Sequence, residues 1–203
     1  MNLLSQSFYR KDGITLAKDL LGQILVREED GNCYGFRIVE TEAYMGADDK
    51  GAHVYGNKKT ARTAPLYEIG GTTYIYLIYG MYHCLNVSAG EKDVPYCVLI
   101  RAVEPIDEKA LEYARQNRPI KSRKIQDLTN GPGKLCQALQ IDKALNGLHV
   151  AQRGPLWIGE GQKPHQIVSA KRINIPYAEE YQDKPWRFYI KDHPFVSVIE
   201  KSE

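Results

Sequence analysis

The 203-residue sequence lacks the features of several large classes of protein. It holds no run of about 18 uninterrupted apolar residues, which argues against a membrane-spanning segment. Its amino end, MNLLSQSFYRKDG, has no basic stretch followed by an apolar one, which argues against a secretory signal. It also has no repeat and no linker rich in serine or glycine. We therefore expect a single domain over residues 1–203, a cytoplasmic location and no membrane partner.

The sequence also has few cysteines and a small net charge. The formal net charge is only +2, which does not by itself indicate a protein that binds nucleic acid. The cysteines show neither a CxxC pair nor the spacing of metal ligands; they are Cys33, Cys84, Cys97 and Cys136. Scattered thiols of this kind are typical of free cysteines in a reducing compartment. We therefore predict no metal and no other cofactor.

The hydrophobic pattern predicts more strands than helices. Strands are expected at residues 24–27, 33–44, 72–78, 83–88, 96–104, 157–158, 167–173 and 187–190. Helices are expected at residues 16–22, with Thr15 as the cap, at 107–117 and within 130–141. Because the strands gather early and do not alternate regularly with helices, the pattern indicates an α+β fold. The polar segment 48–65 is longer than a mere connection needs, which favours a functional loop.

Two acids end one of these predicted strands, in FRIVETEAY at residues 36–44. Since side chains alternate along a strand, one face is expected to carry Phe36, Ile38, Glu40, Glu42 and Tyr44. The ordinary explanation is a strand end that emerges into water with solvated acids. The functional alternative is a carboxylate at the mouth of a pocket that acts as a general base, with Arg101 beside it.

Paired carboxylates are also typical of enzymes that hydrolyse O-glycosides. Those enzymes place two carboxyl groups on opposite sides of a sugar, about 5–9.5 Å apart. Glu40 and Glu42 point the same way from one strand, so they are poorly placed to flank a sugar. We regard an O-glycosidase as the weaker alternative.

Tyrosine is abundant, with 14 tyrosines against 4 phenylalanines. Four of them lie in YIYLIYGMYHCLN, residues 74–86, and Tyr74 and Tyr76 share one face of a predicted strand. Aromatic faces attract delocalised cations and stack nucleobases. The pattern as a whole favours a surface against which a flat ligand lies, although an interface or core packing is the better explanation of any single tyrosine.

The same stretch predicts a hairpin whose loop is residues 79–82, where Gly80 permits a tight turn. Tyr79 and Met81 then project from the end of a two-stranded arm. An exposed apolar tip needs something to contact. Enzymes that act on a base inside a duplex insert such a side chain into the base stack. The alternative is that the arm docks on a second protein subunit.

Five segments, in order, resemble the alkyladenine (3-methyladenine) DNA glycosylase family of the animal type. They are VETEAYMG…AH (39–53), TYIYLIYGMYHCLNVS (73–88), CVLIRAVEP (97–105), NGPGKLCQAL (130–139) and KPWRFYIKDHPFVSV (184–198). The resemblance implies one α+β domain with a curved, mainly antiparallel sheet, flanking helices and a protruding β-hairpin. It also implies a monomeric, monofunctional DNA-repair enzyme without lyase activity.

The implied partner is double-stranded DNA with an alkylated or deaminated purine. The implied reaction flips out 3-methyladenine, 7-methylguanine or hypoxanthine, hydrolyses the N-glycosidic bond with an activated water and leaves an abasic site. By resemblance, Glu42 is the general base and Arg101 helps to hold the water, while Glu40 has a supporting role.

The remaining matched positions concern the base and the DNA stack. The walls of the base pocket match Tyr44, His53 and Tyr76. Asn86 matches the position that discourages normal guanine by clashing with its amino group. Tyr79 matches the side chain that intercalates through the minor groove, and Met81 lies beside it.

Two basic groups become candidates for contact with DNA phosphates once DNA is the expected partner. They comprise Lys58, Lys59 and Arg62 in one loop and Arg115, Arg118, Lys121 and Arg123 in RQNRPIKSRK, residues 115–124. Solvated surface charge is the ordinary explanation of such runs. Lys134 ends NGPGK, which lacks the spacing of a nucleotide-hydrolysing phosphate loop. This turn is equally consistent with a phosphate contact and with a simple helix cap. A non-catalytic module that recognises damaged DNA remains the alternative for the whole chain.

Overall fold

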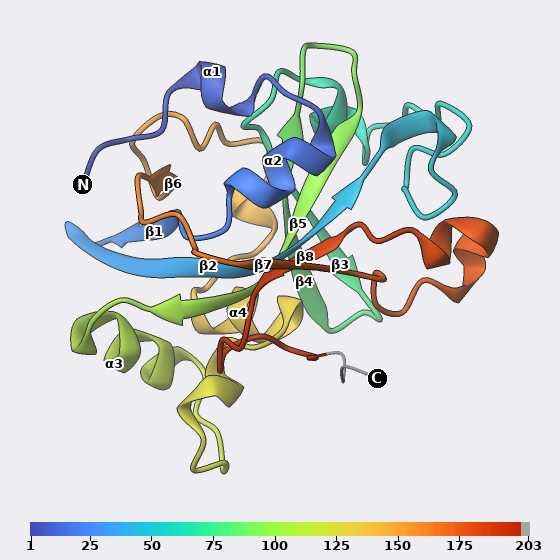
Figure 1. Ribbon diagram of the computed structural model, residues 1–203. Helices are drawn as coiled ribbons and strands as arrows, with labels where there is room; N and C mark the ends of the chain where they lie inside the picture. The colour runs from blue at the N-terminus through green and yellow to red at the C-terminus, as the bar shows by residue number, and fades with distance from the viewer. Residues whose placement is uncertain (200–203) are drawn as a thin grey trace.

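The computed structural model of the chain describes residues 1–199 and shows one sheet with helices packed around it (Figure 1). Within these residues the sheet has eight strands, and its main path runs β3-β4-β5-β2-β1-β6. The strands are β1 Ile24–Glu29, β2 Asn32–Tyr44, β3 Thr73–Ile78, β4 Tyr82–Ala89, β5 Tyr96–Pro105, β6 Leu156–Gly159, β7 Ile167–Ala170 and β8 Arg187–Ile190. Each of these strand pairs is antiparallel, and β8 joins β7 to β2. The predicted α+β class is confirmed.

The two ends of the main path approach each other. The backbone N–H of Thr73 in β3 donates to Leu148 O, and the N–H of Ile158 in β6 donates to Val150 O. Residues 147–150 therefore link the two ends, and the sheet curves around the largest apolar cluster. This cluster includes Leu16 of α2 and Leu135 of α4, so helices and sheet share one core.

Four α-helices and five short 3₁₀ segments lie within residues 1–199. They are α1 Gln6–Tyr9, α2 Gly13–Asp19, α3 Glu108–Asn117, α4 Pro132–Ala138, η1 Gly46–Asp48, η2 Ala64–Tyr67, η3 Ile125–Leu128, η4 Lys143–Leu145 and η5 Pro176–Asp183. The prediction that Thr15 caps a helix over 16–22 is wrong. Asp12 is the cap, because its Oδ1 accepts from the N–H groups of Ile14 and Thr15 at 3.0 and 2.9 Å.

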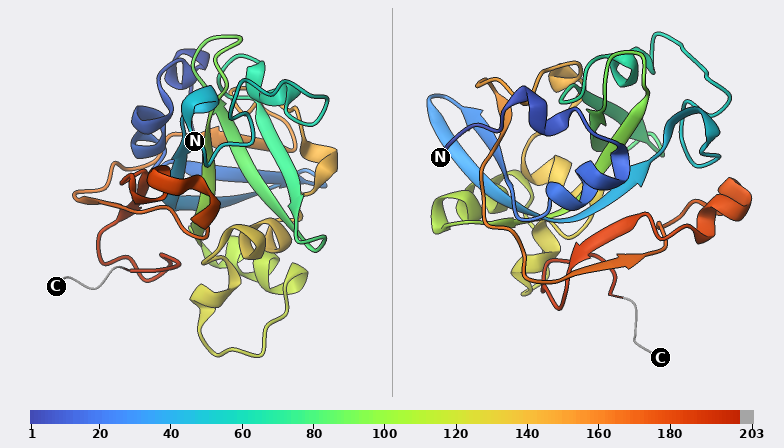
Figure 2. Two further views of the ribbon diagram at one scale, coloured as in Figure 1. Left: turned by 90° about the vertical axis from the view of Figure 1, so that its right-hand side faces the viewer. Right: turned by 45° about the horizontal axis from the view of Figure 1, so that its top comes forward.

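The strand expected over residues 167–173 is also too long. β7 ends at Ala170, where its pairing with β8 ends. Residues 171–184 then leave the sheet and lie on the same side of the molecule as the long loop that begins at η1 (Figure 2). Lys50 joins the two segments by donating to Glu180 Oε2 at 3.0 Å.

A double irregularity in the β2–β5 pair changes which residues share a face. Ile38 pairs with Val103, Glu40 with Ala102 and Thr41 with Ile100, so Val39 and Arg101 have no partner across this ladder. Each unpaired residue inverts the alternation of its own strand.

The expectation that Phe36 and Ile38 share a face with Glu40, Glu42 and Tyr44 is therefore wrong. Phe36, Ile38 and Ala43 belong to the main core, and the Thr41 hydroxyl donates to Ala17 O in α2. Val39 packs in a separate cluster with Phe195. The two acids and Tyr44 face away from the main core.

The β3–β4 hairpin projects as predicted, with Tyr79 and Met81 exposed at its tip. Tyr79 and Gly80 both have positive φ, +53° and +67°, as the two central residues of a type I′ turn require. In the β1–β2 hairpin, Asp30 and Gly31 also have positive φ, +49° and +73°, although this loop has two residues between paired positions where the β3–β4 loop has three. Aspartate is common there, whereas tyrosine in this left-handed region costs about 1–2 kcal/mol.

No helix within residues 1–199 combines the length and the apolar character needed to cross a bilayer.

Candidate active site

The register of β3, β4, β5 and β2 sets the candidate site. Tyr74 pairs with Asn86, Asn86 with Leu99, and Leu99 with Glu42, so these four residues form one row across four strands. Two positions along β3, Tyr76 pairs with Cys84. Residues two apart on a strand share a face, so both rows lie on the face away from the main core.

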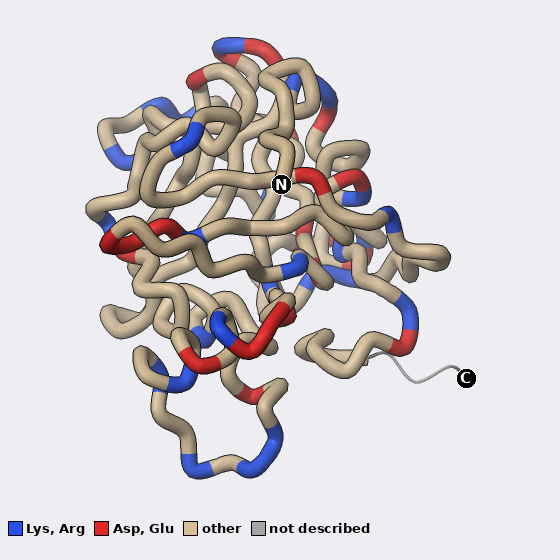
Figure 3. The backbone as a smooth tube through the Cα atoms, turned by 90° about the vertical axis from the view of Figure 1, so that its left-hand side faces the viewer, with Lys and Arg blue, Asp and Glu red and all other residues tan. Residues whose placement is uncertain are grey.

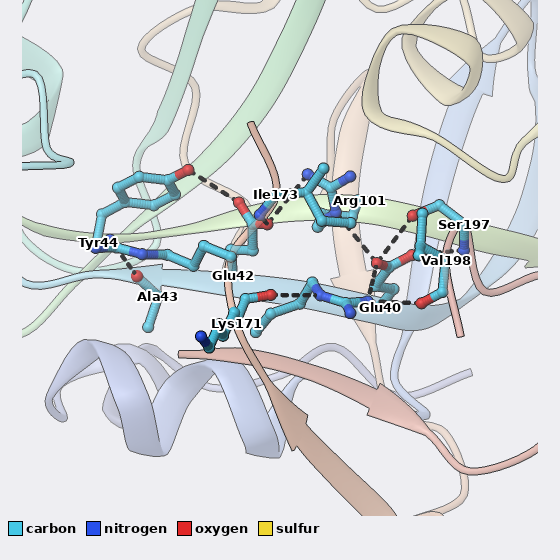
Figure 4. Close-up of polar contacts among 11 residues, drawn as sticks. Glu40, Glu42, Ala43, Tyr44, Arg101, Lys171, Ile173, Ser197 and Val198 are labelled. Carbon is cyan, nitrogen blue, oxygen red and sulfur yellow. Dashed lines mark hydrogen bonds and ion pairs between the residues drawn. The ribbon is translucent and has the colours of Figure 1, made fainter. Parts of the chain in front are cut away.

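The Glu42 carboxylate is held by three hydrogen-bonding groups from three parts of the chain (Figure 4). The Tyr44 hydroxyl donates to Oε2 at 2.9 Å, and the backbone N–H of Ile173 donates to Oε1 at 2.8 Å. Arg101 Nη1 lies 3.2 Å from the same Oε1. Oε2 thus has one contact for two lone pairs and retains an open acceptor position.

Glu42 lies at the floor of a cleft of about 770 Å³. The residues that line this cleft also include Tyr79 of the hairpin and Tyr177 of η5. The Glu42 side chain itself is 0 % exposed to bulk water. The carboxylate is therefore positioned and shielded by its neighbours, and a ligand in the cleft has to displace some of them to reach it.

Arg101 connects the two acids of β2. Its Nε donates to Glu40 Oε1 at 3.2 Å, while Nη1 pairs with Glu42. Burial lowers the pKa of Arg101, but the charges of Glu42 and Glu40 outweigh burial and leave that pKa above its ordinary value. Arg101 is the unpaired residue of β5, and bulges commonly redirect a side chain next to a functional site.

Glu40 is held by other partners and is not among the residues that line the cleft. Its Oε1 accepts from Arg187 Nη1 at 3.0 Å and from the Ser197 hydroxyl at 2.9 Å, and its Oε2 accepts from the Ser197 N–H at 2.8 Å. The side chain is 0 % exposed. Glu40 therefore anchors Arg101 and the C-terminal segment.

An aromatic cavity adjoins the carboxylate. Tyr44, His53, Tyr74, Tyr76 and Asn86 are among its lining residues. The His53 ring packs edge-on to Tyr76, with 4.5 Å between the ring centroids, so the two rings form one continuous wall. The cavity measures only about 30 Å³, which suits a water molecule and is less than a purine occupies. The walls must separate to admit a base.

Hydrogen bonds fix the orientation of the residues around this cavity. His53 Nδ1 lies 2.9 Å from the Tyr74 hydroxyl, and Asn86 Nδ2 donates to Tyr74 O at 3.1 Å. Burial, followed by the charge of Arg62, lowers the pKa of His53, so its ring is neutral at pH 7. Burial raises the pKa of Tyr74 to about 12, so this phenol keeps its proton.

Sequence reasoning missed three contributors to the site, which all follow β7. Ile173 supplies its N–H to Glu42, Arg172 packs over the Tyr44 ring at 4.7 Å, and Tyr177 lines both the cleft and the aromatic cavity. The sequence around Arg172 carries no local sign of these contacts, because the partners of residues 172 and 173 lie about 130 positions earlier in the chain.

The predicted basic residues differ in how they are held. Arg62 lies over the Tyr76 ring at 5.5 Å, beside the candidate site. Lys59 pairs with Asp93, Arg115 with Glu108, and Lys134 donates to Asn130. Arg118 donates to Asp127 O.

Lys121 and Arg123 occupy the exposed loop between α3 and η3, which projects at the bottom of Figure 3. Lys58 is exposed in the long loop that follows η1. Within the described part of the chain, none of these three side chains forms an ion pair.

The sequence is similar to those of other proteins over most of its length. A family model described as methylpurine-DNA glycosylase (MPG) matches residues 7–194. A protein of Natranaerobius thermophilus is 50 % identical over 197 residues, which covers 96 % of this chain and 98 % of the relative. A protein of Clostridioides difficile is 49 % identical over 203 residues, which covers 93 % and 100 %. Both relatives are named "Putative 3-methyladenine DNA glycosylase".

Proposed function

Because the chain belongs to the methylpurine-DNA glycosylase family, we propose that it repairs DNA by releasing alkylated purines from an extruded nucleotide. Its substrates are 3-methyladenine, 7-methylguanine and hypoxanthine in double-stranded DNA. Glu42 activates a water molecule, which hydrolyses the N-glycosidic bond and leaves an abasic site without cutting the strand.

The observation that carries this proposal is the state of the Glu42 carboxylate. Two hydrogen bonds and an ion pair with Arg101 orient it, and among the described residues Oε2 accepts only from Tyr44, which leaves one acceptor position. A water that donates there is aligned to attack C1′ of the sugar. Its oxygen bonds to C1′ as the C1′–N bond breaks, its proton passes to Glu42, and the base leaves with the bonding electron pair.

A single working carboxylate is enough for this chemistry. An alkylated purine carries positive charge and needs little acid assistance to leave, whereas an O-glycoside needs a proton donor on its leaving oxygen. Glu40 is held by Arg187 and Ser197 and, unlike Glu42, is not among the residues that line the cleft. A single carboxylate at the cleft therefore favours an N-glycosidase over an O-glycosidase.

The aromatic cavity favours an electron-poor base. Tyr44, Tyr76 and the neutral His53 ring offer electron-rich faces, and such faces attract a delocalised cation. Asn86 sits in the same row as Glu42 and narrows the cavity floor, which supports a role in rejecting the amino group of normal guanine.

The exposed hairpin tip supports extrusion of the nucleotide. Tyr79 is 75 % exposed and Met81 is 69 % exposed, and Tyr79 lines the same cleft as Glu42. A tyrosine is retained there at a conformational cost that Asp30 avoids in the β1–β2 hairpin. We infer that Tyr79 fills the space vacated by the extruded base.

The proposal also requires movement. The aromatic cavity holds only about 30 Å³ and Glu42 is covered, so the cleft opens when the nucleotide enters.

One incubation tests the proposed function. A duplex with a single 7-methylguanine is treated with the protein, and free purine and alkali-labile abasic sites are measured. We expect both in equal amounts, with an intact strand before alkali treatment. Tight binding without released purine would instead indicate a non-catalytic module, and strand cleavage without alkali would contradict a monofunctional enzyme.

A further inference from the structure

We propose that Arg172 is a positioning residue for base release, because its guanidinium fixes both Tyr44 and Ile173, which hold Glu42. This inference rests on the proposed function of Glu42. Among the described residues Arg172 makes no hydrogen bond to Glu42, so its effect passes through these two neighbours.

The guanidinium is bound at both of its terminal nitrogens. Nη1 donates to Asp49 Oδ2 at 2.6 Å, and Nη2 donates to Asp49 Oδ1 at 2.8 Å, which is a bidentate pair with both side chains 0 % exposed. Nη1 also donates to Ala43 O at 3.1 Å, and Nη2 to Tyr181 O at 3.2 Å. Bidentate geometry fixes orientation as well as distance, which a lysine cannot reproduce.

The contact with Ala43 O places Ile173. Ala43 lies in β2 between Glu42 and Tyr44, so the bond from Arg172 to Ala43 O ties residues 172–173 to the strand that carries the catalytic carboxylate. The Ile173 N–H then meets Glu42 Oε1 at 2.8 Å. Without the tie, this donor sits on a segment that has already left the sheet.

The same guanidinium orients Tyr44. Its Cζ lies 4.7 Å from the Tyr44 ring centroid and 5.0 Å from that of Trp186, so it contacts two aromatic rings. Burial, followed by the charge of Glu42, raises the pKa of Tyr44 well above its ordinary value, so the hydroxyl keeps its proton. The ring held by Arg172 therefore aims a stable donor at Glu42 Oε2.

Asp49 extends the arrangement to the loop that frames the cavity. Its carboxylate also accepts from the N–H groups of Met45 at 3.0 Å and Gly51 at 2.9 Å. A Cβ at Gly51 would come within 2.9 Å of Arg172 Nη2, so this position has little room for a side chain. One ion pair thus joins the loop after η1, strand β2 and residues 171–184, all of which border the site.

Stability alone is a weak explanation of this pair. A buried ion pair loses much of its attraction to desolvation, and apolar residues of similar volume often stabilise a fold equally well. Arg172 Nε is moreover buried without a hydrogen-bond partner in the described residues. The Arg172–Asp49 pair is therefore better explained by the need to fix the positions of its neighbours than by a gain in stability.

The test compares Arg172→Lys and Asp49→Asn with the wild type in single-turnover release of 7-methylguanine, below the melting temperature of every variant. Misplacement of reacting groups by about 1 Å costs on the order of 100-fold in rate. We expect a loss of roughly 10- to 100-fold in rate for both variants. Affinity for a duplex with a tetrahydrofuran abasic site should change by less than about threefold.

Arg27→Lys is the matched control. Arg27 is similarly buried, and its guanidinium donates to Leu139 O and Pro155 O; among the described residues it makes no hydrogen bond to Glu42, Tyr44 or Ile173. This variant should lose thermal stability and keep its rate within about twofold. Asp49→Asn removes the charge of the partner but leaves Arg172 in contact with the rings of Tyr44 and Trp186. This variant therefore still tests the inference should Arg172→Lys fail to fold.

A double-mutant cycle with Tyr44→Phe separates positioning from general damage. If Arg172 acts through Tyr44, the rate loss of the double variant is smaller than the product of the single losses. Unchanged rates in both single variants, or a parallel loss of rate and affinity, would overturn the inference. A wild-type protein that releases no purine would instead contradict the proposed function itself.

Discussion

The Tyr44 hydroxyl donates a hydrogen bond to Glu42 Oε2 over 2.9 Å, which joins a wall of the aromatic cavity to the carboxylate beside it. A base that stacks on Tyr44 is thereby placed at a fixed offset from Glu42. In the proposed function, the ring that contacts the base and the carboxylate that activates water therefore form one connected unit, and Arg101 and Ile173 hold its other side.

Replacing Tyr79 separates the function of the hairpin tip from its stability. Tyr79→Gly removes the wedge and relieves a positive φ of +53°, because glycine adopts this conformation without a Cβ penalty. We expect an unchanged or higher melting temperature together with weaker extrusion, measured with a fluorescent base analogue beside the lesion. Asp30→Gly makes the same change in the other hairpin and should leave extrusion intact. Normal extrusion by Tyr79→Gly would remove the wedge from the mechanism.

The neutral His53 ring predicts a pH dependence of binding to a cationic base. Its pKa is lowered below the ordinary 6.5 by burial and by Arg62, so the ring gains its proton only below that pH. In a Glu42→Gln background, which lacks the carboxylate, preference for a 7-methylguanine duplex over an undamaged one should be constant from about pH 8 to about pH 6.5. It should fall at lower pH as the protonated ring repels the base.

His53→Gln provides the control for this titration. The variant has no imidazole to protonate, so its preference should stay flat over the same range. A change in preference between about pH 7 and 8 in the parent would mean that the histidine titrates near or above its ordinary pKa.

The buried Glu40 network makes a strong prediction for stability. Glu40→Gln leaves Arg187 and Arg101 facing a neutral amide in a site closed to water. Removing one partner of a buried ion pair typically costs about 3–5 kcal/mol of unfolding free energy, measurable by urea denaturation. Glu91→Gln breaks the exposed pair with Arg10 and should have no measurable effect. Equal stabilities of the two variants would contradict the structural role of Glu40.

The basic loop between α3 and η3 is tested by the salt dependence of binding. Lys121 and Arg123 are exposed there, with no acid in the stretch RQNRPIKSRK. If each contacts a phosphate of undamaged duplex, its replacement by glutamine should reduce the slope of log affinity against log salt by about 0.9. Lys18→Gln on α2 serves as a charge-matched control. Slopes identical to that of the wild type would exclude this loop from the DNA interface.

Sequence patterns predicted most of the sheet, because alternation and turn residues are local signals. The hairpin around Gly80 and the strands on both sides of it were predicted within one residue of β3 and β4. Alternation failed at Val39, where an extra residue inverts the faces of β2. Neither Val39 nor Arg101 is a glycine, so no local signal marks these irregularities.

The candidate site was predicted in part for the same reason. Glu42, Arg101 and the tyrosines lie on neighbouring strands, and the structure brings them together in adjacent rows. Arg172 and Ile173 lie about 130 positions from Glu42 in the sequence, and only the tertiary fold places them at the carboxylate. Contacts of this kind leave no periodic trace in a single sequence.

The rate of base release by Glu42→Gln tests the central claim most directly. Glutamine keeps the size of the side chain but cannot accept a proton from water, and general bases typically contribute about 10²- to 10⁴-fold to a rate. We expect that single-turnover release of 7-methylguanine by Glu42→Gln falls by this factor, while its affinity for the damaged duplex stays within about threefold of the wild type. Release at the wild-type rate by a well-folded Glu42→Gln protein would show that another group activates the water.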